Sequence, residues 1–385
     1  VLRDAGVVII TIAVGGRRAW ERDVFIPRRY GIHQPVGDTV MPGGTSRAMR
    51  MIPAVNAIVR DVLDLAPRAL LFNYANPMAA ICRGVWQETD APLIGLCHGV
   101  HSTARYLANV LGCDPATIGY SATGINHLTW FTRIRKDSED LVPRLIQIRR
   151  EWVRRTGRDT RCAGENDRGD RNSPGRNPFS WELLERYGAI PSALDRHVIE
   201  FFPEQFSTVA SYYGKTPGVD AFSFEDCIAR GDLAYERMSE DALSSTSLPE
   251  EYLAEIGGEH EQVLDIVESC RRDSHSIYSA TMPNGGQVPN LPEGAPVEAP
   301  ARATADGLIP LVQSSLPEAL AEHLRGKFNW VERTVAAARE PTVANMADAL
   351  LADGAVTKHE VAEALASDLL GAHRIPFDEN KGSAR

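Results

Sequence analysis

The chain has 385 residues, of which 24% are charged and 43% are hydrophobic, proportions close to those of an ordinary soluble globular protein. These proportions exclude a collagen, a coiled-coil rod and a wholly disordered chain, and the length suggests two domains or one large interwoven domain. With 41 basic and 51 acidic residues the net charge is −10, which disfavours nucleic acid and anionic membranes as partners.

The chain also carries little sign of export or membrane insertion. Its longest apolar run, residues 7–14, is far shorter than the ~20 residues that a membrane helix needs, and no basic segment of a secretory signal precedes it. Six cysteines without any Cys-x-x-Cys pair are typical of reduced cytosolic thiols. We therefore expect a cytoplasmic protein without a membrane partner.

Strands and helices alternate in the first third of the chain. The β-branched run at residues 7–14, closed by Gly15-Gly16, is typical of a strand buried on both faces of a parallel sheet. Further strands are predicted at 69–72, 92–97 and 117–122, and helices at 46–65, 77–85 and 100–111. This alternation predicts an α/β fold with a doubly wound parallel sheet, and we assign residues 1–135 to a partial, Rossmann-like dinucleotide-binding domain.

Helical periodicity dominates after residue 135. We expect residues 136–385 to form a mostly helical α+β domain that contributes to the substrate and metal site and to oligomerisation. The predicted helical segments are 140–155, 181–188, 224–242, 248–280, 317–338, 342–352 and 357–371. The Pro- and Gly-rich stretch 287–312 predicts strands or a long hairpin, and the polar stretch 156–178 predicts a mobile loop.

The residues that follow the predicted strands carry the chemistry. These segments are Val14-Gly15-Gly16, residues 73–77 (Asn-Tyr-Ala-Asn-Pro), Cys97-His98-Gly99 and residues 124–127 (Gly-Ile-Asn-His). In a doubly wound sheet such ends meet at one edge, where ligands bind. A cysteine and histidines there suit Mn²⁺, Fe²⁺, Co²⁺ or Ni²⁺. The spacing alone leaves open that Cys97 is a small buried hydrophobe and His127 a structural hydrogen bonder.

The order of these motifs resembles glycoside hydrolase family 4, whose members depend on NAD and manganese. The matching pieces are residues 12–16, Pro42-Gly43-Gly44, residues 50–53, 73–77, 97–100 and 124–130, Asp195-Arg196-His197, and residues 288–292 and 297–298. The motif Cys97-His98-Gly99-Val100 is most similar to the subgroup that acts on α-linked uronic acids, the α-glucuronidases and α-galacturonidases. The resemblance implies a homodimer or homotetramer.

The resemblance also implies roles for single residues. Cys97 and His127 would bind the metal, Asn76 and Asn126 would bind sugar hydroxyls, and His98 would be the acid at the departing oxygen. The residues implied at the cofactor are Asn73, Val14 and Gly15.

The base and the carboxylate clamp remain open between alternatives. Asp195 is the best match for the base, with Tyr212 and Tyr213 as alternatives, although Asp195 could instead cap a helix over residues 196–202. Arg196 is the first candidate to grip a uronic acid carboxylate with two parallel hydrogen bonds, and Arg47 and Arg50 are its rivals.

The resemblance implies hydrolysis in four steps: oxidation of C3 by NAD⁺, elimination across C1 and C2, addition of water at C1, and return of the hydride. No Gly-x-Gly-x-x-Gly follows a strand in residues 1–60, so we expect the chain to begin after the first nucleotide-binding unit, with weak NAD binding if that unit is absent. The alternatives are a 2-hydroxyacid dehydrogenase, which needs no cysteine–metal site, and a catalytically silent truncated homologue.

Overall fold

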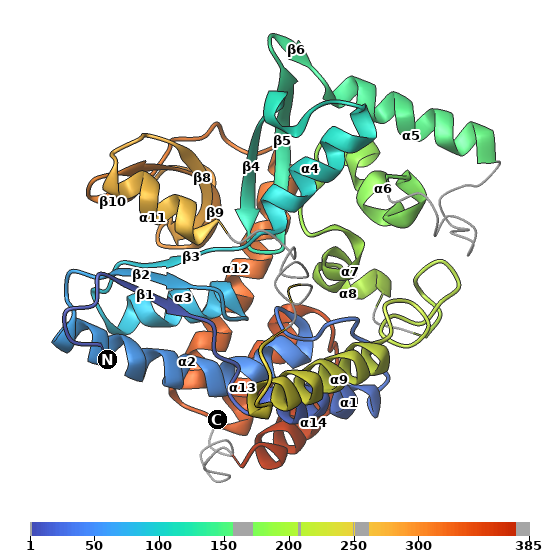
Figure 1. The fold of residues 1–385 in the computed structure, drawn as a ribbon. Helices are drawn as coiled ribbons and strands as arrows, with labels where there is room; N and C mark the ends of the chain where they lie inside the picture. Colours follow the sequence, from blue (N-terminus) through green and yellow to red (C-terminus); the bar gives the residue numbers. More distant parts are fainter. Residues whose placement is uncertain (1, 157–171, 207–208, 249, 251–261, 375–385) are drawn as a thin grey trace.

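A computed structural model describes residues 2–156, 172–206, 209–248, 250 and 262–374 (Figure 1). Its described strands form one sheet in the order β1-β2-β3-β8-β9-β4-β5-β6, with β10 beside β9 and β7 beside β5. The parallel part consists of β1 (Val7–Ile10), β2 (Leu70–Asn73) and β3 (Leu93–Gly95). The strands predicted at 69–72 and 92–97 are confirmed. The strand predicted at 7–14 extends only over residues 7–10, and its predicted burial on both faces is wrong: β1 lies at the edge of the described sheet and Ile9 is 41% exposed.

Four helices accompany the parallel strands: α1 (Gly16–Arg28), α2 (Met41–Leu65), α3 (Met78–Glu88) and α4 (Gly99–Leu111). The predicted helical stripe of α2 is buried, including Ile52, Val55 and Val59. α2 begins five residues before its predicted start and includes Gly43 and Gly44. A Cβ on Gly43 would lie 2.4 Å from the carbonyl oxygen of Gly37, so only glycine allows this close approach.

The rest of the sheet is antiparallel and corrects one prediction. The strand predicted at 117–122 exists as β4 (Gly119–Ile125), but it pairs antiparallel with β5 (Leu128–Lys136) and β9 (Pro296–Thr304) rather than extending the parallel part. Only two residues connect β4 to β5, and a link that short permits only an antiparallel pair. The remaining strands are β6 (Glu139–Asp140), β7 (Ile190–Pro191), β8 (Ile277–Pro283) and β10 (Gly307–Pro310).

The hairpin predicted within 287–312 is confirmed by β9 and β10. The helix predicted at 248–280 is only partly correct, because α11 spans Val263–Arg271 and residues 277–280 belong to β8. Residues 249 and 251–261 lie outside the described residues, as do residues 157–171 of the predicted loop.

Further helices surround the sheet, and none of the described helices is long and apolar enough to cross a membrane. They are α5 (Val142–Thr156), α6 (Pro178–Tyr187), α7 (Leu194–Val198), α8 (Pro203–Phe206), α9 (Phe224–Leu243), α12 (Glu318–Arg339), α13 (Val343–Asp353) and α14 (His359–Ala372), with short 3-10 turns at Pro115–Thr117, Pro174–Arg176 and Ile199–Phe201 (η4). α12 packs on α2, where Trp330 Nε1 donates to Thr45 Oγ1 at 3.0 Å.

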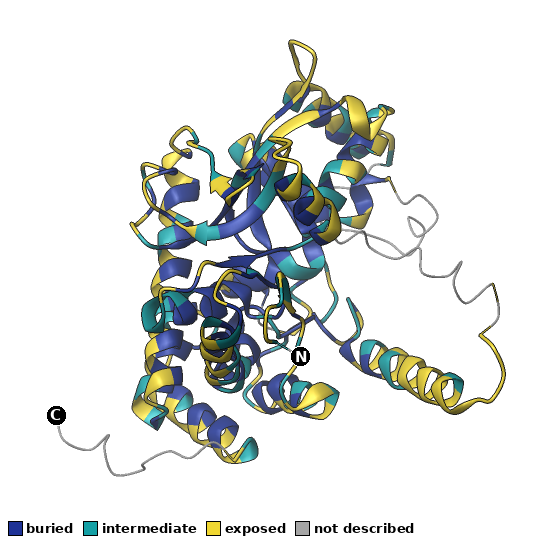
Figure 2. Ribbon diagram, turned by 60° about the vertical axis from the view of Figure 1, so that its left-hand side comes forward, coloured by how far each residue is buried: buried dark blue, intermediate teal, exposed yellow. Residues whose placement is uncertain are grey.

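Buried residues run through the centre of the molecule from the sheet into the helices below it (Figure 2). Because β8 and β9 pair with β3 and β4, strands from both sides of residue 135 share one sheet. The division into regions 1–135 and 136–385 therefore stays a proposal.

Candidate active site

Three side chains of the types that can bind a metal, from distant parts of the chain, meet at one place. Asp38 lies between α1 and α2, His127 lies in the turn between β4 and β5, and His197 lies on α7. One ligand atom of each residue lies within 4.8 Å of the other two. The rings of His127 and His197 are 4.3 Å apart between centroids. We call these three residues the metal-binding group.

Hydrogen bonds orient two members of this group. The Thr39 hydroxyl donates to Asp38 Oδ1 at 2.6 Å and lies 2.9 Å from His127 Nδ1. Because the hydroxyl proton is used toward Asp38, Nδ1 must be the donor in the second bond. His127 Nε2 then carries a lone pair, the form in which imidazole binds a metal. Asn76 Nδ2 donates to Asp38 Oδ2 at 3.1 Å and holds the carboxylate from the other side.

Burial and charge give the group its protonation state. Burial lowers the pKa of His127 to about 4, against an opposing effect of Asp38. Burial also lowers the pKa of His197 well below its usual value. Burial raises the pKa of Asp38, but Arg47 and the two histidines outweigh it and leave that pKa below its usual value. At neutral pH the group is thus one carboxylate and two neutral imidazoles.

This donor set fits a divalent transition metal. Neutral imidazole and carboxylate are ligands of ions such as Mn²⁺, Co²⁺ and Ni²⁺, which bind deprotonated donors. His197 Nδ1 is buried and has no hydrogen-bond partner among the described residues, an arrangement that leaves this atom to a ligand.

The family resemblance implies Cys97 and His127 as metal ligands, whereas the structure groups His127 with Asp38 and His197. Cys97 Sγ accepts the N–H of Gly99 at 3.3 Å, at the start of α4, and it is not in the metal-binding group. Cys97 therefore stays a predicted ligand. Asp38 was missed because it follows no strand, whereas His197 stood in a matched motif without an assigned role.

His98, the predicted acid, lies beside the group. It is the N-cap residue of α4. The pKa values of His127 and His197 are lowered mainly by the burial of these two rings, and the charge of His98 lowers both pKa values further. An electrostatic effect of this kind requires proximity, so His98 lies near these two histidines.

Asp195, the predicted base, is enclosed by donors. Its Oδ1 accepts from the N–H and hydroxyl of Ser180 at 2.7 and 2.6 Å, and its Oδ2 accepts from the N–H of Phe179 and the hydroxyl of Tyr212 at 2.9 and 2.7 Å. The carboxylate thus caps the first turn of α6, and not residues 196–202 as the sequence alternative held. To act as a base, it would have to release one of these donors.

The alternative bases are also held in their protonated forms. Burial raises the pKa of Tyr212 well above its usual value, and the neighbouring Asp195 raises it further. Burial, Asp195 and Glu182 likewise raise the pKa of Tyr213. Because Tyr212 donates to Asp195, these two residues form one unit through which a proton could pass.

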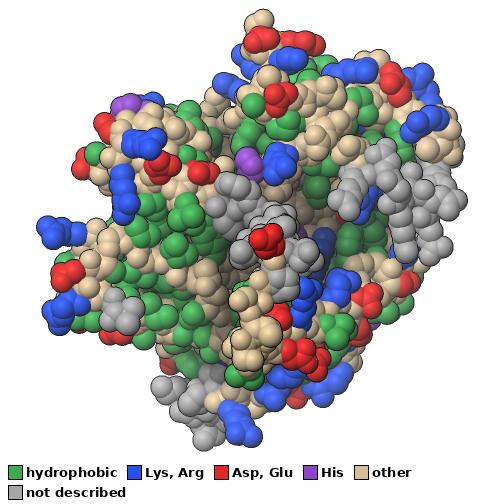
Figure 3. Space-filling view, in the orientation of Figure 1, with side chains coloured by type: hydrophobic (Ala, Val, Ile, Leu, Met, Phe, Trp, Pro, Cys, Tyr) green, Lys and Arg blue, Asp and Glu red, His purple; other side chains and the backbone are tan. Residues whose placement is uncertain are grey.

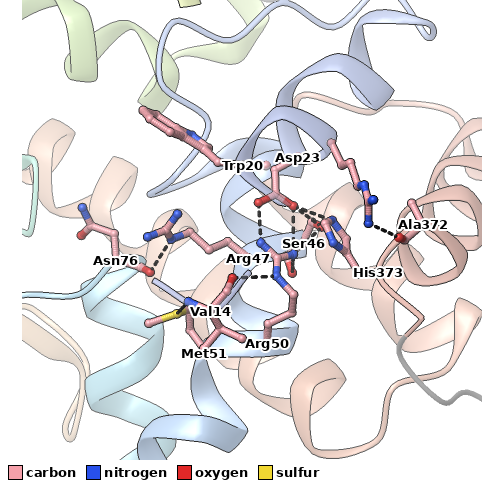
Figure 4. Close-up of polar contacts among 12 residues, drawn as sticks. Val14, Trp20, Asp23, Ser46, Arg47, Arg50, Met51, Asn76, Ala372 and His373 are labelled. Atoms are coloured by element: carbon pink, nitrogen blue, oxygen red, sulfur yellow. Dashed lines mark hydrogen bonds and ion pairs between the residues drawn. The ribbon is translucent and has the colours of Figure 1, made fainter. Parts of the chain in front are cut away.

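Arg50 is not available as a carboxylate clamp. Its Nη1 and Nη2 bond Asp23 Oδ1 and Oδ2 at 3.0 and 2.6 Å, and both side chains are buried. Ser46 and His373 also reach Asp23, so this carboxylate joins α1, α2 and the end of α14 (Figure 4). The prediction of Arg50 as a rival clamp is wrong, because both of its Nη atoms already donate to Asp23.

Arg47 and Arg196 remain as candidates. Arg47 Nε donates to the carbonyl of Asn76 at 2.9 Å, and its two Nη atoms have no hydrogen bond within the described residues (Figure 4). Arg196 Nη2 donates to Cys227 Sγ at 3.4 Å, and its buried Nε has no partner there. Lys and Arg side chains also border the hollow right of centre in Figure 3.

Asn126 has an open acceptor, as a sugar-binding residue requires. Its Nδ2 donates to Glu298 Oε2 at 3.4 Å, while its buried Oδ1 has no partner in the described part of the chain. A buried carbonyl oxygen without a donor carries a desolvation cost that a ligand hydroxyl would remove.

The predicted cofactor residues lie in different settings. Gly15, at φ 84°, is exposed and is the N-cap of α1, where glycine has no side chain that could cap the helix; the N–H of Gly16 donates to the carbonyl of Ala13 at 2.9 Å. Such a helix start favours an anionic group. The Val14 N–H lies 3.3 Å from Met51 Sδ. Asn73 is buried and its amide bonds both backbone groups of Ala75, so its side chain closes its own turn.

Comparison with known proteins agrees with the motifs. Residues 1–113 match the family model for family 4 glycosyl hydrolases, and residues 122–356 match the model for the C-terminal domain of that family. An α-galacturonidase of Bacillus subtilis is 34% identical over 327 residues, which cover 82% of this chain and 70% of that protein. An α-galactosidase of the same organism is 28% identical, with 88% and 73% covered.

Solved structures share the fold. The crystal structure of lplD from Bacillus subtilis, named as a glucosidase, superposes with a TM-score of 0.78 at 30% identity, and 96% of this chain and 84% of that chain are covered. A 6-phospho-β-glucosidase of Thermotoga maritima, solved with manganese, NAD⁺ and glucose-6-phosphate, has a TM-score of 0.74 at 19% identity, with 97% and 82% covered.

The chain therefore belongs to glycosyl hydrolase family 4 and is a glycoside hydrolase with a Rossmann-like mixed sheet and a helical second part. This membership confirms the family resemblance and replaces the alternative of a 2-hydroxyacid dehydrogenase. The boundary between the two family models falls at 113–122, earlier than the proposed division at 135.

Proposed function

We propose that this chain hydrolyses α-glycosides of uronic acids, either α-galacturonides or α-glucuronides, with NAD and Mn²⁺ as cofactors. The observation that carries the proposal is Arg47, whose charge acts on Asp38 of the metal-binding group and whose two Nη atoms have no partner in the described residues. A guanidinium in this position can bind a sugar carboxylate with two parallel hydrogen bonds. The α-galacturonidase relative supports the same substrate class.

Two groups of residues would hold the cofactors. Asp38, His127 and His197, with Cys97 as a further predicted ligand, would bind the metal. The start of α1 at Gly15, which has no side-chain cap, would meet NAD. The manganese and NAD⁺ in the Thermotoga maritima relative support this pair of cofactors. When bound, NAD supplies reversible oxidation of the sugar, and the metal supplies a Lewis acid that acidifies the adjacent C–H group.

The chain's own residues bind the sugar and move two protons. Arg47 or Arg196 binds the carboxylate, and Asn126 Oδ1 accepts a sugar hydroxyl. His98 gives a proton to the oxygen that leaves C1, since histidine is the side chain that most often acts as a general acid. The unit of Asp195 and Tyr212 receives the proton from C2. A homodimer or homotetramer and a cytoplasmic location remain predictions.

The test is release of nitrophenol from 4-nitrophenyl α-galacturonide, α-glucuronide and α-galactoside by the purified chain with NAD⁺, Mn²⁺ and a thiol reductant. We expect release of nitrophenol from one of the uronides. When that uronide carries deuterium at C2, we expect the deuterium to exchange with the solvent during the reaction. Preference for the galactoside would refute the assignment of uronic acids. A folded chain that releases nothing from any of the three would be the catalytically silent homologue.

A further inference from the structure

A buried carboxyl group connects two segments that carry the metal-binding group. Glu200 lies in η4 and is 1% exposed. Its Oε1 accepts the backbone N–H groups of Val36 and Gly37, both at 2.8 Å. Gly37 directly precedes Asp38 in the chain, so these bonds fix the backbone immediately before one ligand.

The same side chain is tied to a second ligand. η4 follows α7 without a gap, and His197 on α7 stands three residues before Glu200. The positions that Glu200 joins are more than 160 residues apart in the sequence. One carboxyl oxygen therefore connects the segment that presents His197 to the segment that presents Asp38.

Thr39 and Asn76 hold the Asp38 side chain, whereas other groups hold the backbone before it. Trp20 Nε1 donates to the carbonyl of Val36 at 2.7 Å, which fixes the acceptor side of this backbone. Gly37 has φ 60° and lacks a side chain that could anchor it. Two buried N–H groups without an acceptor would cost free energy, so the backbone would shift if Glu200 lost its oxygen.

We infer that Glu200 is a positioning residue for the metal-binding group: it sets the separation of Asp38 and His197, and through it the affinity for a divalent cation. This inference rests on the proposed function. Only Oε1 carries the contact, because Oε2 is buried without a hydrogen-bond partner among the described residues. An amide oxygen can replace Oε1 in accepting both N–H groups, whereas a thioether of the same length is only a weak acceptor.

The experiment is a calorimetric titration of the purified chain with Mn²⁺ alone, without NAD or sugar. The variants are Glu200→Gln, which keeps the acceptor oxygen, and Glu200→Met, which keeps the length of the side chain but has no acceptor oxygen. We expect Mn²⁺ affinity within about twofold of the parent for Glu200→Gln and weaker by roughly 10- to 100-fold for Glu200→Met, the range for residues that orient metal ligands.

A core variant separates positioning from general loss of stability. Leu365→Ala removes a fully buried side chain on α14 and is compared by its thermal midpoint and Mn²⁺ affinity. Equal Mn²⁺ affinity of the parent and a folded Glu200→Met would overturn the inference, as would an equal loss in Leu365→Ala. If Glu200→Met does not fold, Glu200→Asp, which withdraws the carboxyl group by one methylene, takes its place in the same comparison.

The parent titration tests the proposed function separately. If the parent chain does not bind Mn²⁺, the proposed metal site itself is wrong, and the positioning role of Glu200 is rejected with it. If the parent binds and Glu200→Met binds equally, only the role of Glu200 is rejected.

Discussion

Replacement of Arg47 by methionine should change which sugar the enzyme prefers. Arg47 Nε is used by the Asn76 carbonyl, so two Nη atoms remain for a substrate carboxylate. A hydrogen bond to a charged group contributes about 1.5 kcal/mol at the low end, so two contribute about 3 kcal/mol. Since 1.4 kcal/mol corresponds to a factor of ten, kcat/KM for a uronide should fall by roughly 100-fold.

The assay compares two substrates that differ only at C6. Kcat/KM is measured for 4-nitrophenyl α-galacturonide and α-galactoside, and the ratio removes effects on the metal or on the Asn76 turn, which both substrates share. Arg60→Met is the matched control, since Arg60 lies on the same helix but is exposed and paired with Glu88. An equal loss for both substrates in Arg47→Met would refute the clamp, and the same measurement on Arg196→Met would then decide its rival.

Three further predictions concern stability. Asp23→Asn should lower the free energy of unfolding by about 3 kcal/mol, because it leaves buried Arg50 without its counter-charge, and a change below 1 kcal/mol in urea unfolding would contradict this. Asp195→Ala should lower the free energy of unfolding by more than Tyr212→Phe does, because Tyr212→Phe removes only one hydrogen bond, worth about 1 kcal/mol. Equal losses in the two variants would show that Asp195 does not anchor α6. The metal-free fold should also lose stability as the pH falls below about 6.5, because His127, with a pKa of about 4, stays neutral when folded while its unfolded form takes up a proton. By pH 5 the parent should have lost about 2 kcal/mol of its free energy of unfolding relative to His127→Gln. If the gap between the two free energies of unfolding does not change with pH, the reasoning is refuted.

Much of the fold follows from local sequence. The stripe of Ile52, Val55 and Val59 specifies one buried face of α2, because the helical repeat brings these residues together without help from the rest of the chain. The same holds for the apolar run of β2, whereas the apolar run of β1 lies at the edge of the described sheet and leaves Ile9 41% exposed. β4 was misplaced because strand order and direction depend on which distant segment pairs with it, and a pattern of hydrophobic residues contains no such information.

Motifs and their order, by themselves, determined the family and several residues that surround the site, including His98, Asn126 and His127. Only the tertiary structure decided how the charged groups are used. Arg50 and Arg47 stand three residues apart on α2, yet Asp23 closes the guanidinium of the first, while the second keeps two Nη atoms without a partner among the described residues. Asp38 joins His127 and His197 because folding brings three remote segments within reach. Sequence spacing cannot supply this result, since each contact depends on residues far away along the chain.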